Sequence, residues 1–179
     1  MLELAPFTPY SSKPTAESRQ AIARQVVNPS AALTEQIIQG LVQIVALEGP
    51  LLSSRLFGLY AKRGGMTKLS KIAKRRFVMA LNKAIQDKQI SMEFDTTPDN
   101  GVAVLWLPSM QRVVPREYGN RGFDEIPASE LGEVMFELAA ATTDEKNQLF
   151  QNMAELYGLT HLPKNATTRL EYVYIQCIG

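Results

Sequence analysis

The feature of this sequence that most restricts its fold is a change in the spacing of its apolar residues near residue 90. Before that point, apolar residues recur every three to four positions, which is the period of an amphipathic α-helix. After it, Ile90, Met92 and Phe94 alternate with polar residues, as in a half-buried β-strand. The chain is therefore expected to place several helices against a small β-structure.

The β-structure is predicted to be a hairpin. The alternating segment is followed by TTPDNG and then by the apolar run VAVLWL. Asn100-Gly101 favours a type I′ turn, because both central residues of that turn need a positive φ. A helical region followed by a hairpin is the element order of a winged helix, in which the hairpin is the wing. The predicted fold class is mainly α with a small β-hairpin wing (α+β), in tandem winged-helix or helix-turn-helix units.

Capping residues and helix breakers divide the helical region into segments. Thr15 is expected to cap the first helix, Ser30 to precede the second, and Gly49-Pro50 to end the second. Thr67 is expected to cap the fourth helix. The predicted helices span residues 16–27, 31–48, 53–62 and about 68–87.

Positive charge is concentrated in the fourth helix and in the turn before it. Residues 62–88 contain nine Lys or Arg and one Asp, a balance of +8, whereas the rest of the chain has ten basic and seventeen acidic residues, a balance of −7. The whole chain has a net charge of only +1. Such asymmetry is typical of a surface that faces a polyanion.

A helical wheel divides the basic residues of this region into two groups. Lys68, Lys71, Lys74 and Arg75 lie on the outward side, whereas Arg76 and Ile72 flank the apolar side. A helix-turn-helix presents this helix to the major groove of DNA. Lysine there releases counterions from phosphates, and arginine can bind a guanine edge. We expect Lys68 and Lys71 to contact phosphates, and Arg75 to reach a base edge.

Three polar residues extend this predicted surface. Asn82 lies on the outward side of the same helix, and Thr97 and Asn100 belong to the hairpin, where they are candidates for contact with the DNA backbone. Two other interpretations of the basic surface stay open. It could bind an acidic protein partner, or it could be an ordinary solvated surface.

The chain also matches itself at an offset of 93 residues. Gly65 aligns with Gly158, Thr67 with Thr160, Arg76 with Arg169, and Ala84 with Cys177. This predicts a second helix-turn-helix-like unit without a full wing. Its outward residues are nearly neutral, which favours packing or partner docking: His161, Lys164, Thr168 and Glu171. The shared Arg76 and Arg169 are expected to tie helices together.

These observations give four predicted regions. Residues 1–30 form an extended, proline-containing arm and a short helix, and residues 31–108 form the first winged-helix unit. Residues 109–126 form a linker, which Arg112, Arg116 and Arg121 make basic. Residues 127–179 form the second unit.

Several functional classes find no support in the sequence. Cys177 and His161 are each the only residue of their kind, so a disulfide within the chain and a Cys/His zinc cluster are excluded, and Cys177 is expected in the core. The sequence contains no phosphate-binding loop and no catalytic motif, and we expect a protein that is not an enzyme and has no cofactor, metal or evident small-molecule substrate. Without a long apolar run or a secretion signal, a cytoplasmic location is expected.

The segment around the third and fourth predicted helices carries a family resemblance. Val45, Glu48, Gly49 and Pro50, followed by Leu56, Gly65, Arg76 and Leu81, form a pattern of helices and turns, and IPASEL follows at residues 126–131. This pattern resembles the uncharacterised domain at the C-terminus of large bacterial superfamily-one helicases that carry a Vsr-like nuclease domain. The resemblance covers about residue 32 to the end of the chain. It implies a role in a DNA-processing or phage-defence assembly, although helicase and nuclease domains are absent from this sequence.

The sequence therefore predicts non-catalytic binding of duplex DNA, with a helicase or nuclease as a further partner. The alternative is an adaptor whose two units dock partner proteins. A transcription repressor is a third interpretation, but the sequence shows no dedicated dimerisation helix.

Overall fold

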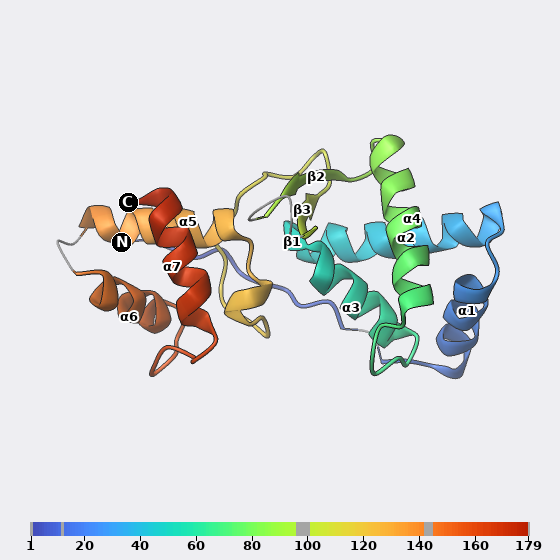
Figure 1. Cartoon of the computed structure of the whole chain (residues 1–179), viewed down its shortest axis with the longest axis horizontal. Helices are drawn as coiled ribbons and strands as arrows, with labels where there is room; N and C mark the ends of the chain where they lie inside the picture. The colour runs from blue at the N-terminus through green and yellow to red at the C-terminus, as the bar shows by residue number, and fades with distance from the viewer. Residues whose placement is uncertain (1, 12, 96–100, 142–144, 179) are drawn as a thin grey trace. The chain divides into compact units, whose positions relative to one another are not determined.

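The structure of the chain, a computed structural model, describes residues 2–11, 13–95, 101–141 and 145–178. These residues are mainly α-helical and include a small antiparallel sheet, as the sequence predicts (Figure 1). The chain divides into two compact units. We call Pro9–Gln111 the N-terminal unit, and Met1–Thr8 together with Arg112–Gly179 the C-terminal unit.

Four helices of the N-terminal unit begin and end close to the predicted residues. They are α1 (Ala16–Val27), α2 (Ala31–Glu48), α3 (Ser53–Arg63) and α4 (Lys71–Gln86). The side chain of Thr15 accepts a hydrogen bond from the backbone N–H of Ser18, and that of Ser30 accepts one from Leu33. The predicted cap at Thr15 is confirmed, and Ser30, expected to precede α2, caps it; each satisfies a backbone donor that the first helical turn leaves unpaired.

The sheet of this unit has three strands in the order β1-β3-β2. Strands β2 (Ser91–Phe94) and β3 (Ala103–Trp106) form the predicted antiparallel pair, with Met92 opposite Leu105. Strand β1 (Leu51–Leu52) pairs with the other edge of β3. The sequence analysis missed β1, because two residues are too few to show an alternating pattern.

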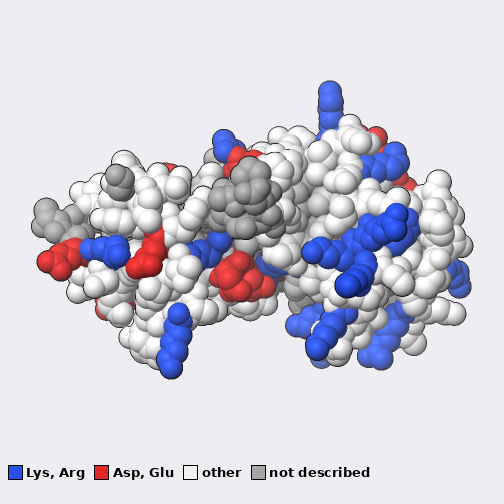
Figure 2. Space-filling model, viewed as in Figure 1, with Lys and Arg blue, Asp and Glu red and all other residues white. Residues whose placement is uncertain are grey.

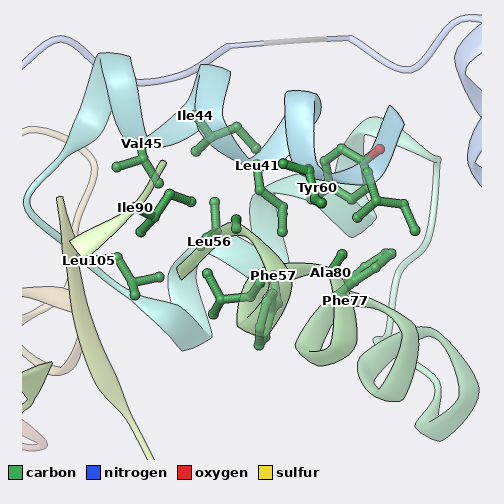
Figure 3. Packing of buried hydrophobic residues seen from close by; sticks show 14 of the residues in the cluster. Leu41, Ile44, Val45, Leu56, Phe57, Tyr60, Phe77, Ala80, Ile90 and Leu105 are labelled. Carbon is green, nitrogen blue, oxygen red and sulfur yellow. The ribbon is translucent and has the colours of Figure 1, made fainter. Parts of the chain in front are cut away.

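The core of the N-terminal unit lies between α2, α3, α4 and the sheet (Figure 3). The ring of Phe77 on α4 meets the ring of Tyr60 edge-on, with 5.0 Å between centroids, and the ring of Phe57 at 6.1 Å. Ile90 and Leu105 bring the sheet into the same cluster. Burial of this continuous apolar surface fixes α4 with one face inward, which leaves its other face to solvent.

A buried ion pair joins the end of α2 to α3. The carboxylate of Glu48 is fully buried and accepts hydrogen bonds from Arg55 Nε at 2.6 Å and Arg55 Nη2 at 3.1 Å. It also accepts one from the backbone N–H of Tyr10 at 2.6 Å. The start of this unit is thereby attached to α2, and the buried carboxylate has the partners that it needs.

The C-terminal unit contains a short 3-10 helix and three α-helices. They are η2 (Phe123–Glu125), α5 (Ala128–Ala141), α6 (Lys146–Leu156) and α7 (Ala166–Cys177). Apolar residues of all four elements form one core, in which α5 packs against α6 and α7. The expectation of a buried Cys177 is wrong, because this residue is exposed at the last position of α7, beyond the buried Val173.

The first residues of the chain belong to the C-terminal unit. Ala5 forms a parallel β-bridge with Arg116, and the ring of Phe7 lies under the Arg121 guanidinium, 4.4 Å from its central carbon. Gly119 has φ +60°, and a Cβ atom there would lie 2.3 Å from the Phe7 ring. The glycine is therefore required for both its backbone angle and the close approach of Phe7.

The arginines of the predicted linker (residues 109–126), which we call the connector, do not form a basic surface. Arg116 and Arg121 are buried, and both donate hydrogen bonds to the buried carboxylate of Glu130 on α5, at distances of 2.9 and 3.0 Å. The expectation of a basic linker is therefore wrong for these two residues. The sequence analysis missed this cluster, because the partner carboxylate becomes close only when the connector folds onto the first turn of α5.

The helix bounds of the two units show the same offset as the sequence. Helix α6 begins and ends 93 residues after α3, as a comparison of Ser53–Arg63 with Lys146–Leu156 shows. The following turns contain Gly65 with φ +74° and Gly158 with φ +75°. Both glycines adopt the left-handed conformation that closes a helix at its C-terminus.

Candidate nucleic-acid interface

The candidate interface is built on α4, which begins later than predicted. Ser70 is its N-cap, and the Ser70 hydroxyl accepts a hydrogen bond from the backbone N–H of Ala73 at 3.1 Å. The expectation that Thr67 caps this helix is wrong. Thr67 and Lys68 instead lie in the turn between α3 and α4, and Ser70 takes over the capping because its hydroxyl reaches the helix start.

The inward face of α4 holds the helix in place. Ala73, Phe77, Ala80 and Ala84 are fully buried, as the helical wheel predicts. The three alanines allow α2 to approach closely, and Phe77 fills the space between α2 and α3. The opposite face of α4 therefore has a fixed orientation relative to the rest of the N-terminal unit.

The predicted basic residues lie on the exposed side. Lys71, Lys74 and Arg75 on α4 are exposed, and so is Lys68 in the preceding turn. Figure 2 shows Lys and Arg side chains gathered over α4 and near the turn before it, with acidic atoms near the opposite end of the helix. We call Lys68, Lys71, Lys74 and Arg75 the basic surface.

The other three predicted contact residues have different outcomes. Asn82 is exposed on α4, two turns beyond Arg75. Thr97 and Asn100 lie outside the residues that the structure describes.

Two apolar side chains are also exposed on α4. Ile72 is 64% exposed and Met79 is 51% exposed, and the spacing of seven residues places them on one side of the helix. The expectation that Ile72 flanks the buried face is wrong. Ile72 lies in the first turn of α4, where the side chain points to solvent, whereas Arg76, one turn later, is buried.

Arg76 is separate from the basic surface and ties helices together, as predicted. Its guanidinium is buried and donates hydrogen bonds to the backbone carbonyls of Gln25 and Asn28 at 3.3 Å, and to the hydroxyl of Thr34 at 3.1 Å. These acceptors lie at the end of α1, just after it and at the start of α2. Arg76 therefore fixes α4 against the α1–α2 connection.

The C-terminal half of α4 has a basic residue of another kind. Lys83 donates a hydrogen bond to Asp87 at 2.8 Å, and this contact raises the pKa of the Lys83 ammonium. Both side chains are exposed. Lys83 thus stays charged but is paired with the opposite charge of Asp87, which makes it a suitable control for the basic surface on the same helix.

The equivalent surface of the C-terminal unit has little net charge. His161, Lys164, Thr168 and Glu171 are all exposed, as predicted for its outward side. Glu171 accepts a hydrogen bond from Lys146 on α6 at 3.3 Å. Arg169 donates a hydrogen bond to the carbonyl of Ile126, just before α5, as Arg76 does to the carbonyl of Asn28, just before α2.

Across the described ranges, no group of three or more His, Cys, Asp or Glu side chains is arranged to hold a metal ion. Within the same ranges, every helix is too short or too polar to cross a membrane.

No protein-family model, curated protein or solved structure matches this chain.

Proposed function

We propose that the N-terminal unit is a non-catalytic DNA-binding module whose basic surface contacts duplex DNA. The observation that carries this proposal is the exposure of Lys71, Lys74 and Arg75 on one side of a helix that is fixed by its buried face, together with Lys68, which is exposed in the turn before that helix. Their charges lie within two helical turns and have no acidic residue among them in the sequence. Such an arrangement favours phosphate binding through the release of counterions.

We further propose that residues 31–108 form a winged helix, in which α3 and α4 are the helix-turn-helix. The element order α2, β1, α3, α4, β2, β3 supports this assignment. The matching bounds of α3 and α6 and the matching turns at Gly65 and Gly158 support a second, wingless copy at residues 127–179. In this arrangement α4 is the helix that enters the major groove.

The cellular setting of the proposal rests on the family resemblance of the sequence. A bacterial DNA-processing or phage-defence assembly in the cytoplasm would contain the helicase or nuclease with which this module works. The module would hold DNA for its partner rather than cleave it.

The test is a salt titration of binding to random-sequence duplex DNA, measured by fluorescence anisotropy. Affinity should fall steeply with salt, and Lys71→Ala or Arg75→Ala should each reduce the slope of log K against log salt by about 1. Lys83→Ala is the matched control on the same helix, and its slope should equal that of the wild type. Absence of binding by micromolar protein at low salt would overturn the proposal.

Protein docking on α4 is a second candidate function, which the exposure of Ile72 and Met79 favours. The buried core of a protein interface is more apolar than the rest of its area and is enriched in methionine and arginine. Replacement of both by serine would separate the two functions. DNA binding through phosphates should keep its salt slope, whereas binding to a protein partner recovered from cells should be lost.

A further inference from the structure

An open cavity of about 230 Å³ lies between α1, α2 and α3 of the N-terminal unit. Ala21, Ile22 and Gly40 form the apolar part of its wall. The remaining lining residues are polar, and four of them are glutamines: Ser18, Gln25, Gln36, Gln39, Gln43, Tyr60 and Arg63. No sequence motif indicates this cavity, because its residues come from three helices at irregular spacing.

The deep wall of the cavity is rigid. Gln25 is only 5% exposed, and its side-chain oxygen accepts a hydrogen bond from the Tyr60 hydroxyl at 2.7 Å. Its side-chain nitrogen donates to Gln36 at 3.3 Å, and its backbone carbonyl accepts from Arg76. Gln25 is thus fixed at both ends, so a ligand would meet a wall that needs little reorganisation.

A glycine in the middle of α2 makes this wall possible. A Cβ atom at Gly40 would lie 2.3 Å from the Tyr60 ring, so the ring can cross α2 toward Gln25 only because Gly40 has no side chain. Glycine inside a helix destabilises it relative to alanine. The close approach of Tyr60 gives this glycine a structural purpose.

The outer part of the cavity carries hydrogen-bond donors and a positive charge. Among the described residues that line it, Arg63 alone is charged. Arg63 Nη1 donates to the side-chain oxygen of Gln43 at 3.3 Å, and the side-chain oxygen of Gln36 accepts from Gln25. Because these contacts use the amide oxygens of Gln36 and Gln43, the groups of these two side chains that could bind a ligand are their N–H donors, of which each amide has two.

We propose that this cavity binds a small ligand with an oxyanion, a carboxylate or a phosphate, attached to a flat apolar ring. The oxyanion would accept hydrogen bonds from Arg63 and the glutamine amides, because charge-assisted hydrogen bonds to arginine are the strongest available here. The ring would lie against Ala21, which is the partly exposed apolar residue of the wall. The volume equals that of about eight water molecules at roughly 30 Å³ each, which suits a single ring with one anionic group.

The experiment measures binding of three probes to the full chain by calorimetry and ligand-observed NMR, without DNA, so that its result is independent of the proposed DNA binding. The probes are benzoate, phenyl phosphate and benzamide. Benzoate and phenyl phosphate differ in the oxyanion, and benzamide has the size of benzoate without its charge. At least one anionic probe should bind about tenfold more tightly than benzamide, and the preferred anion identifies the source of the oxyanion.

Two variants assign the binding to this cavity. Arg63→Gln should weaken the preferred anion by about tenfold, and Ala21→Leu should abolish binding by filling the cavity. Lys62→Gln, which removes the same charge from the neighbouring exposed position of α3, should leave binding unchanged. Fluorescence of Trp106, the only tryptophan of the chain, reports whether each variant of this unit is folded. Equal binding of benzamide, no effect of Arg63→Gln in a folded variant, or no binding of any probe up to about 10 mM would overturn the proposal.

Discussion

Basic residues gather twice in this chain, and the two groups lie in opposite environments. Lys71, Lys74 and Arg75 are exposed on α4. Arg116 and Arg121 are only 6% and 3% exposed, because the buried carboxylate of Glu130 binds both of them. A local excess of positive charge therefore becomes a surface only where the fold brings no carboxylate to it.

Helices α4 and α7, which correspond in the repeat, extend this comparison. Arg76 on α4 and Arg169 on α7 both donate hydrogen bonds to backbone carbonyls, so the residue that the repeat shares has a structural role. The outward residues differ, because Lys74 and Arg75 correspond to Thr167 and Thr168 at the offset of 93. Function is thus expected where the two units differ, and architecture where they agree.

The largest effect is expected from removal of the Glu130 carboxylate, which pairs with the buried Arg116 and Arg121. Glu130→Leu leaves two buried guanidinium groups without their counter-ion and should lower the free energy of unfolding of the C-terminal unit by about 3–5 kcal/mol. Hydrogen exchange of the α5 and α7 amides measures this loss. Glu133→Leu, at an exposed position of the same helix, is the control, and an equal effect of the two changes would show that the cluster is not what stabilises this unit.

A somewhat smaller effect is expected at the arginine of α4 that faces the core. Arg76→Met leaves the carbonyls of Gln25 and Asn28 without their donor and should cost about 2–4 kcal/mol of unfolding free energy. Urea unfolding followed by Trp106 fluorescence measures it in the N-terminal unit. Arg75→Met should leave stability unchanged, and the distinction between the two neighbouring arginines fails if it does not.

The stability of the N-terminal unit should also depend on pH through a buried tyrosine. Burial raises the pKa of Tyr60 from 10.0 to about 12. Between these values the unfolded chain releases its proton while the folded chain keeps it, so stability is full below pH 10 and falls as the pH rises toward 12. The loss is at most about 3 kcal/mol for a shift of this size.

Urea unfolding at pH 9 to 11, followed by Trp106 fluorescence, measures this dependence. Lysines also titrate in the range, so the relevant quantity is the difference between the wild type and Tyr60→Phe. Tyr60→Phe should lose about 1 kcal/mol at neutral pH with its hydrogen bond to Gln25, and should show a weaker decline above pH 10. Parallel declines would mean that Tyr60 does not titrate as inferred.

The smallest effect is expected from a test of whether charge alone distinguishes α7 from α4 in binding DNA. In a Lys71→Ala/Arg75→Ala background, Thr167→Lys with Thr168→Arg gives α7 the charges of α4 and should raise affinity for duplex DNA about three- to tenfold at low salt. Anisotropy titration measures the gain. Glutamine at the same two positions is the neutral control, and an equal gain with glutamine would exclude an electrostatic cause.

Local patterns in the sequence determined much of the helical structure. The caps Thr15 and Ser30, the buried face of α4 and the β2–β3 pair follow from spacing and from backbone chemistry that acts within a few residues. The same wheel separated Arg76 from the exposed Lys71, Lys74 and Arg75, because the side of a helix on which a residue lies depends on its position alone.

Tertiary structure decided the features that need distant residues. It gave Arg116 and Arg121 their partner in Glu130, attached Phe7 to the connector, and formed the glutamine-lined cavity between three helices. None of these could be read from spacing, since the free energy of a buried charge or cavity depends on groups far away in the chain. The sequence by itself therefore determined on which side of a helix a charge lies, and only the fold decided whether a charge outside the helices, such as that of Arg116 or Arg121, stays in water or is buried against a carboxylate.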